Sequence, residues 1–439
     1  MRVANYPTEL RTHRPEIFGC GLVASLGILL FDALIFRFGV YYYSDNIFVV
    51  YPVAVNSLLE SLRVDVRPIE FFILLAANKL YLPLWFVVSL LCTVGATLLS
   101  ALACELVFER ALPKEGWWIL GLGNPILFYV TSQAGTVSQA LSNLLFAGAI
   151  FVFVFELRQL PGRLPFGWRA DRVSVFLNLM AAAMFFTKET VVAAGIVLPA
   201  ANALLRFKAR RLSPIFLFSL VLPIVAASCW FLLKLKFPSS EFPTLMGEGP
   251  YDLRLNPIAW GRNLIVTLAF PLTPLPTSFI SFDLLRPLWV VVALGSVIIF
   301  IRLLLREGLR QPKIVLPLLV VAASLAPMIL IRSSELYATM IAPFAVSIVF
   351  LFGLARMRWL TLAYGLLLYT ASLGNAIIYC LGADFNLLGL QHLKYSIYGD
   401  EYQFYPICPI GTTAHVEWDG TAATEDPFYK IKGAMICIR

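Results

Sequence analysis

The sequence predicts an all-α polytopic membrane protein with a bundle of about 11 transmembrane helices. Two observations lead to this prediction. Of the 439 residues, 59% are hydrophobic and 14% are charged, whereas soluble domains have about 45–50% apolar and about 25% charged residues. The apolar residues also fall in long runs separated by short basic loops, as expected for helices that satisfy their backbone groups internally within a bilayer.

Each predicted span is an apolar run bounded by charged or turn-forming residues. The spans cover residues 17–39, 83–107, 117–131, 138–157, 173–187, 190–205, 213–233, 287–305, 314–331, 338–354 and 359–381. We therefore expect a transmembrane bundle over residues 1–381, with outer loops at 40–82 and 234–286. The more polar residues 382–439 contain no spanning run and are expected to form a small extracytoplasmic cap.

Lysine and arginine are concentrated in alternate loops, and this bias sets the predicted orientation. The loops 158–172 and 206–211 are strongly basic, whereas the turns 132–137 and 332–337 carry only Arg332 between them. Basic short loops stay on the cytoplasmic side. The sequence therefore predicts a multi-pass membrane protein with a cytoplasmic N-terminus and a C-terminus on the opposite side. If the membrane is the bacterial inner membrane, the C-terminus is periplasmic.

The segment 263–282 is apolar but carries three prolines, and closely spaced prolines break a helix. If it spanned the membrane, the basic loop 302–313 would lie outside. We therefore expect 234–286 to be a long outer loop with re-entrant or interfacial pieces.

The stretch 41–79 is the first candidate for a functional loop. Asp45 follows three tyrosines and precedes two short amphipathic stretches, 47–62 and 69–79. These stretches are too short to span, and their aromatic residues favour the membrane interface. Asp45 could act as a general base on a hydroxyl, ligate a divalent cation, or cap a helix.

Other isolated charges are expected on the same face of the membrane. They are Asp45, Arg63, Asp65, Arg67, Lys188, Glu189, Arg332 and Glu335. Charged groups near a bilayer usually face the bundle interior or a wet cavity. We therefore predict that they share one cavity that opens outward.

Two of these loops contain residues suited to phosphate. Lys188 offers a point charge, and Arg332 can clamp phosphate through two parallel hydrogen bonds. The alternative for Lys188 and Glu189 is a tight turn whose charges face water. Glu335 could instead simply stabilise the N-terminus of a helix. The segment 131–143 is rich in hydroxyl and amide groups, which suit either sugar hydroxyls or helix caps.

Four short motifs, in this order, resemble those of the GT-C superfamily of integral-membrane glycosyltransferases. They are YSDN at 43–46, VRP at 66–68, the KE hairpin at 188–189 and SELY at 334–337. Within the superfamily, the likeness is to bacterial Gtr-type O-antigen glucosyltransferases, which tend to have an acidic pair and a Gly-Arg-Pro. Here Asn46 replaces the second acid and Val66 replaces the glycine, which weakens the case for a metal held by two carboxylates.

The resemblance implies transfer of a sugar, a hexose such as glucose, from a polyprenyl-phosphate donor. The acceptor would be a cell-envelope glycan such as O-antigen, carried by a lipid or by lipopolysaccharide on the periplasmic face. Asp45 would be the catalytic base, and Lys188, Arg67 and Arg332 would bind the donor phosphate. Substrate contacts are expected from Glu189, Glu335, Tyr337, Asn46 and Asp65. No cofactor is expected, although a divalent metal stays possible. Membrane lipid, a companion flippase and a donor synthase are the expected partners.

Three other functions compete with this hypothesis. An O-antigen polymerase or ligase shares the substrate class and the outer arginines, but it would use a diphosphate-linked glycan. A lipid-linked sugar transporter or flippase often has internal repeats, and we detect none. A histidine-dependent acyltransferase needs a histidine near the membrane, whereas His13, His392 and His415 lie in terminal segments. Nucleic-acid binding is not expected, because the net charge of +8 is spread over short loops.

Two cysteines of the predicted cap, Cys408 and Cys437, would lie on the oxidising side of the membrane. A disulfide between them is one possibility. Two reduced thiols are the other, and Cys380 at the end of the last predicted helix is a rival partner.

Overall fold

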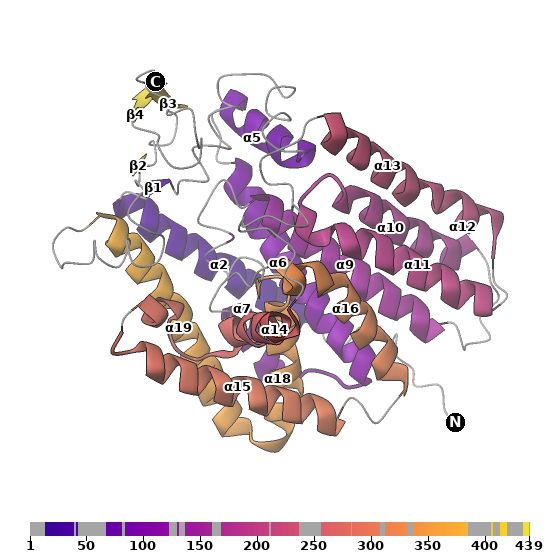
Figure 1. Cartoon of the computed structure of the whole chain (residues 1–439). Helices are drawn as coiled ribbons and strands as arrows, with labels where there is room; N and C mark the ends of the chain where they lie inside the picture. The colour runs from indigo at the N-terminus through magenta and orange to yellow at the C-terminus, as the bar shows by residue number, and fades with distance from the viewer. Residues whose placement is uncertain are drawn as a thin grey trace.

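The computed structural model is a helical bundle with a small β part (Figure 1). It describes residues 14–38, 41–42, 67–80, 84–122, 130, 137–159, 168–209, 212–236, 256–281, 283–307, 312–331, 338–384, 405–406, 413–418 and 433–438.

The helices follow the apolar runs of the sequence. The first half contains α2 (Arg14–Phe38), α5 (Pro68–Leu80), α6 (Leu84–Phe108), α7 (Lys114–Leu122), α9 (Val137–Gln159), α10 (Trp168–Met184), η2 (Glu189–Val191) and α11 (Val192–Lys208). The second half contains α12 (Pro214–Ser219), α13 (Val221–Lys236), α14 (Pro257–Leu272), η3 (Thr277–Ser281), α15 (Arg286–Glu307), α16 (Pro312–Ile331), α18 (Ala342–Arg356) and α19 (Arg358–Asp384).

Among the described residues, five helices are long and apolar enough to cross a membrane. They are Val87–Phe108, Val137–Arg158, Glu189–Lys208, Pro214–Lys236 and Arg286–Arg306. Pro15–Gly27, Ile314–Ala326 and Ala342–Arg356 are shorter apolar helices. This pattern confirms the prediction of a helical membrane protein. The number of eleven spans, the GT-C-like arrangement and the membrane orientation stay predictions.

The core is built around α6 and α9, which pack along much of their length. Large side chains such as Phe146 and Phe153 are completely buried there. Glycines allow the close approach, because a Cβ atom on Gly95 would lie 2.8 Å from Leu144 Cδ1. The glycine therefore lets α6 and α9 pack closely at this point.

The predicted outer loop 234–286 contains helix α14, which packs against α15, α16 and α18. The Asn256 side chain caps it by accepting a hydrogen bond of 3.0 Å from the Ile258 amide. Pro271 lies in its last turn, and Thr273 has extended backbone angles. Proline therefore coincides with the helix end, as expected, although one proline is accommodated inside the helix.

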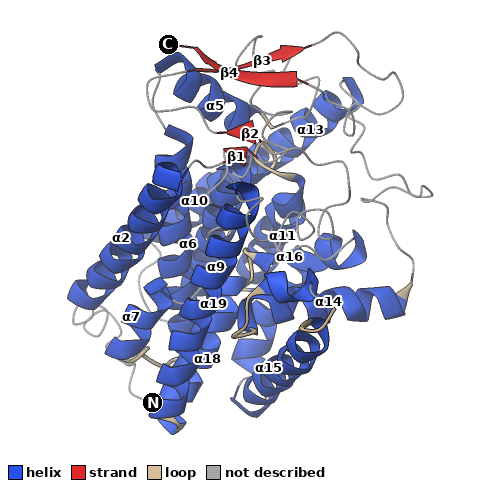
Figure 2. Ribbon diagram, turned by 90° about the vertical axis from the view of Figure 1, so that its left-hand side faces the viewer, coloured by secondary structure: helices blue, strands red, loops and turns tan. Residues whose placement is uncertain are grey.

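Two short antiparallel strand pairs complete the described chain. β1 (Tyr41–Tyr42) pairs with β2 (Tyr405–Pro406), in the register Tyr41 to Pro406. β3 (Thr413–Trp418) pairs with β4 (Gly433–Ile438). Figure 2 shows β3 and β4 at the same end of the bundle as α5, with α7 and α18 toward the other end. The C-terminal segment is therefore tied to the chain just after α2.

Candidate functional site

The candidate site is a cluster of charged side chains at the end of the bundle that carries α5. The turn after α10 approaches the start of α5, where the Ile69 amide donates a 3.3 Å hydrogen bond to the Phe186 carbonyl. Lys188 and Glu189 follow in this turn, and the last turn of α13 contributes Lys234. Three segments far apart in the sequence therefore meet here.

The Glu189 carboxylate joins two of the cations. Its Oε2 accepts hydrogen bonds from Arg67 Nε at 3.3 Å and Arg67 Nη2 at 3.2 Å. Its Oε1 lies 2.9 Å from Lys234 Nζ. The other edge of the Arg67 guanidinium faces a second carboxylate, and Arg67 Nη1 lies 3.7 Å from Glu70 Oε2. The carboxylate of Glu189 thus bridges a guanidinium and an ammonium group, one on each oxygen.

The members of this cluster differ in their access to solvent. The side chains of Lys234 and Glu70 are 3% and 0% exposed, and that of Arg67 is 13% exposed. Glu189 is 35% exposed. Lys188 is also buried, which excludes the alternative of a turn whose lysine faces water. The bridging carboxylate is therefore the part of the cluster most open to the outside.

The charges of the cluster do not cancel among its described members. Arg67, Lys188 and Lys234 are cations, whereas Glu70 and Glu189 are carboxylates. The five side chains together have an excess of one positive charge. Buried charges interact more strongly than charges in water, so these five side chains influence one another strongly.

A buried polar layer supports the cluster from α9. Ser142 Oγ donates to Thr187 Oγ1 at 3.2 Å. Asn143 Nδ2 donates to Thr339 Oγ1 at 2.9 Å, and Gln139 Nε2 donates to Asn143 Oδ1 at 2.8 Å. Side chains from the hydroxyl- and amide-rich segment 131–143 therefore hold two turns in place. One turn precedes Lys188, and the other contains Thr339.

The structure brings together three of the predicted site residues, namely Arg67, Lys188 and Glu189. The other predicted site residues lie outside the described part of the chain; they are Asp45, Asn46, Asp65, Arg332, Glu335, Tyr337 and Cys408. Cys437 lies on β4, where only its backbone pairing with Ala414 is described.

Lys234 and Glu70 were missed by the sequence analysis. Lys234 lies in the last turn of an apolar helix, on the face where the sequence otherwise places few basic residues. Because Lys234 departs from this bias in basic residues between the two membrane faces, it could have been recognised from the sequence as a candidate. Glu70 had no comparable signal, because an acid in the first turn of a helix is common.

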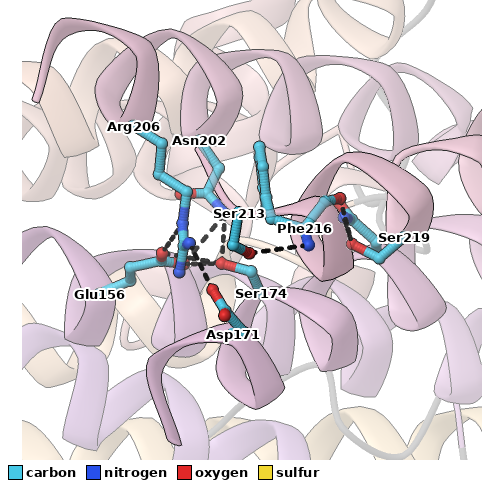
Figure 3. A network of polar contacts seen from close by, with 9 residues as sticks. Glu156, Asp171, Ser174, Asn202, Arg206, Ser213, Phe216 and Ser219 are labelled. Atoms are coloured by element: carbon cyan, nitrogen blue, oxygen red, sulfur yellow. Dashed lines mark hydrogen bonds and ion pairs between the residues drawn. The ribbon is translucent and has the colours of Figure 1, made fainter. Parts of the chain in front are cut away.

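A second ionic network lies at the opposite end of the same helices (Figure 3). Arg206 is completely buried; it contacts Glu156 through Nε, and its Nη1 lies 3.0 Å from Asp171 Oδ1. Ser174 Oγ and Asn202 Nδ2 also donate to Glu156 Oε2, at 2.6 and 2.9 Å. The network joins α9, α10 and α11. Because protein carboxylates engage the guanidinium, we interpret it as a structural clamp.

The Arg206 guanidinium also packs against α12, where its Cζ lies 4.7 Å from the centre of the Phe216 ring. Further along α10, Asn178 Nδ2 donates to Ser219 Oγ at 2.7 Å. Beyond Asn178, the buried apolar side chains of Ala181 and Met184 separate this network from the turn at Lys188.

The described residues contain no group of three or more His, Cys, Asp or Glu side chains placed to hold a metal ion. No protein-family model matches the sequence, and no curated protein matches it. The chemistry of the site therefore follows from its own geometry. One cation lies on each side of a partly exposed carboxylate.

Proposed function

We propose that the chain is a GT-C-type glycosyltransferase. It moves a sugar, a hexose such as glucose, from a polyprenyl-phosphate donor to a cell-envelope glycan such as O-antigen. The observation that supports this most is the meeting of Arg67 and Lys234 beside Lys188 at one end of an apolar helical bundle.

A lipid-linked donor accounts for cations in this position. Its polyprenyl chain stays among the apolar helices, while its phosphate stays near the membrane surface, at the helix ends. A guanidinium fork and a compact ammonium group both bind phosphate in proteins, and the cluster supplies one of each on the two oxygens of Glu189.

The proposed orientation has eleven spans, a cytoplasmic N-terminus and a periplasmic C-terminus. Arg158 near the end of α9 and Lys208 at the end of α11 lie at the end that carries the Arg206 network, opposite Glu189. They belong to the basic loops 158–172 and 206–211 of the sequence. Basic loops favour the cytoplasmic side, so the cluster would face the periplasm. The pairing of β1 with β2 supports a C-terminal cap at this same face.

In the proposed reaction, an acceptor hydroxyl attacks the anomeric carbon of the donor sugar. Asp45 takes the hydroxyl proton, and the bond from the sugar to the phosphate oxygen breaks. Polyprenyl phosphate leaves with an additional negative charge. Arg67, Lys188 and Arg332 hold this charge, while Asp65 and Glu335 contact the sugars.

The test is sugar transfer by purified protein from a polyprenyl-phosphate sugar, comparing wild type with Asp45→Asn, with and without EDTA. We expect Asp45→Asn to lose turnover but retain donor binding. Asp283→Asn is the control, because Asp283 is an exposed acid paired with Arg286 at 3.0 Å. Full activity of Asp45→Asn would exclude that residue as the base. Transfer only from a diphosphate-linked glycan would instead identify a polymerase or ligase.

A further inference from the structure

We propose that Lys234 and Arg67 form a two-sided site for the donor phosphate, and that Glu189 occupies this site as a displaceable counter-ion when no donor is bound. The inference rests on the proposed function and deepens it. It adds Lys234 to the binding residues, and it gives Glu189 a role different from direct contact with sugar.

The first argument is the geometry of the bridge. Each oxygen of the Glu189 carboxylate takes a different cation, at 2.9 Å for Lys234 and 3.2 Å for Arg67 Nη2. Two oxygens of one phosphate group are spaced similarly to the two oxygens of a carboxylate. A phosphate can therefore take the same two partners without rearranging the cations.

The second argument is the edge of Arg67 that faces Glu189. Nε and Nη2 form the side of the guanidinium that binds an oxyanion through two parallel hydrogen bonds. Both point to Glu189, at 3.3 and 3.2 Å. Nη1 instead lies 3.7 Å from the buried Glu70. Glu70 can thus hold Arg67 in place while its Nε–Nη2 edge changes partner.

The third argument is exposure. Glu189 is 35% exposed, whereas Lys234 is 3% exposed. The Glu189 side chain therefore borders solvent, although its Oε1 is buried against Lys234. Turning outward would hydrate the displaced carboxylate, so displacement does not leave an unpaired charge in the interior. The cations, by contrast, are held between helices and stay in the site.

The exchange also fits the charge change of the reaction. Displacement of Glu189 removes one negative charge from beside Arg67 and Lys234. The leaving group changes from a phosphodiester with one negative charge to a phosphomonoester, which carries nearly two at neutral pH. Displacement of Glu189 therefore increases the positive charge where negative charge develops, which is the requirement for transition-state stabilisation.

The test measures binding of polyprenyl monophosphate, without a sugar, to the purified full-length protein. We expect Glu189→Gln to tighten binding by about tenfold, if the carboxylate occupies the site about nine-tenths of the time in the free protein. We expect Lys234→Gln to weaken binding by about tenfold or more, because a charged hydrogen bond to phosphate is lost. Lys234→Arg, which retains the charge, should recover most of the affinity.

The matched control is Glu115→Gln, since Glu115 pairs with Arg358 at the other end of the bundle, and its binding should equal wild type. Thermal melting of each variant shows that it is folded. If Glu189→Gln weakens binding as Lys234→Gln does, Glu189 organises the cations and the inference is wrong. If wild type transfers sugar but Glu189→Gln binds as wild type does, only the inference fails. If wild type neither binds the lipid phosphate nor transfers sugar, the proposed function fails as well.

Discussion

Arg206 and Asp171 form a buried ion pair, with 3.0 Å between Nη1 and Oδ1, that joins the end of α11 to the beginning of α10. Glu156 from α9 contacts the same guanidinium. Arg206 and Glu156 are thus removed from water together, with Asp171 largely buried beside them, and their mutual contacts offset the cost of removing charge from water.

We expect Arg206→Met to lower the free energy of unfolding by about 3–5 kcal/mol, because it leaves two buried carboxylates without their cation. The double variant Arg206→Met with Glu156→Gln should recover part of this loss. Denaturant unfolding in detergent measures both. The control is Arg358→Met, at an exposed pair with Glu115, for which about 0–1 kcal/mol is expected. An equal loss at both sites would contradict the clamp.

Arg67→Lys should raise the donor KM by about ten- to hundredfold, although it keeps the charge. Lysine cannot make the two hydrogen bonds that Nε and Nη2 make, and charged hydrogen bonds contribute about 1.5–3 kcal/mol each. Steady-state kinetics of sugar transfer measure this change. Arg286→Lys is the control, at an exposed arginine that pairs with Asp283. An unchanged KM would remove Arg67 from the phosphate site.

Asn143→Leu should reduce transfer and stability together. Asn143 accepts from Gln139 and donates to Thr339, and all three are buried. Its loss leaves a buried amide without its acceptor, which costs about 1–3 kcal/mol. It also loosens the turn at Thr339, which directly follows the predicted substrate segment 332–337. We expect a lower melting temperature and a lower kcat. An unaltered kcat would show that the hydrogen bonds of Asn143 do not affect catalysis.

Gly195→Leu should destabilise the protein by about 1–3 kcal/mol through overpacking. A Cβ atom there would lie 3.0 Å from the Ala181 carbonyl oxygen and 3.1 Å from Phe185 Cε2. The backbone oxygen cannot move aside, so α10 and α11 must separate near the turn that carries Lys188. Gly261→Leu is the matched control, since nothing lies within 4 Å of its Cβ position. Comparable melting of the two variants would contradict this prediction.

The sequence predicted the helical membrane class because composition and apolar run length determine it directly. It also identified Arg67, Lys188 and Glu189, since each is an isolated charge beside an apolar run. That the three segments meet depends on helix packing, which a single sequence does not encode as a local pattern. Lys234 shows the limit of prediction from the sequence. A lysine at the end of an apolar helix resembles an ordinary flanking charge until its partner is known.

The Arg206 network was missed for a related reason. Glu156 and Arg206 are separated by 50 residues in the chain, and each lies next to a basic loop, where charges are expected for orientation alone. Only the packing of α9 against α10 and α11 buries them. Asp45 lies outside the described residues, so its assignment as the base stays a prediction from the sequence.

The continuous apolar helix from Glu189 to Lys208 has 20 residues, which gives a length of about 30 Å. The Glu189 cluster lies at its first residue, and the Arg206 clamp lies near its last turn. The hydrocarbon layer of a bilayer is also about 30 Å thick. Ion pairs join both ends of this helix to neighbouring segments while Glu189 is in its bridging position. A thinner bilayer must then be matched by tilt of the bundle or by a local change in lipid thickness, and under the proposed function this would set how deeply the donor phosphate lies beneath the membrane surface.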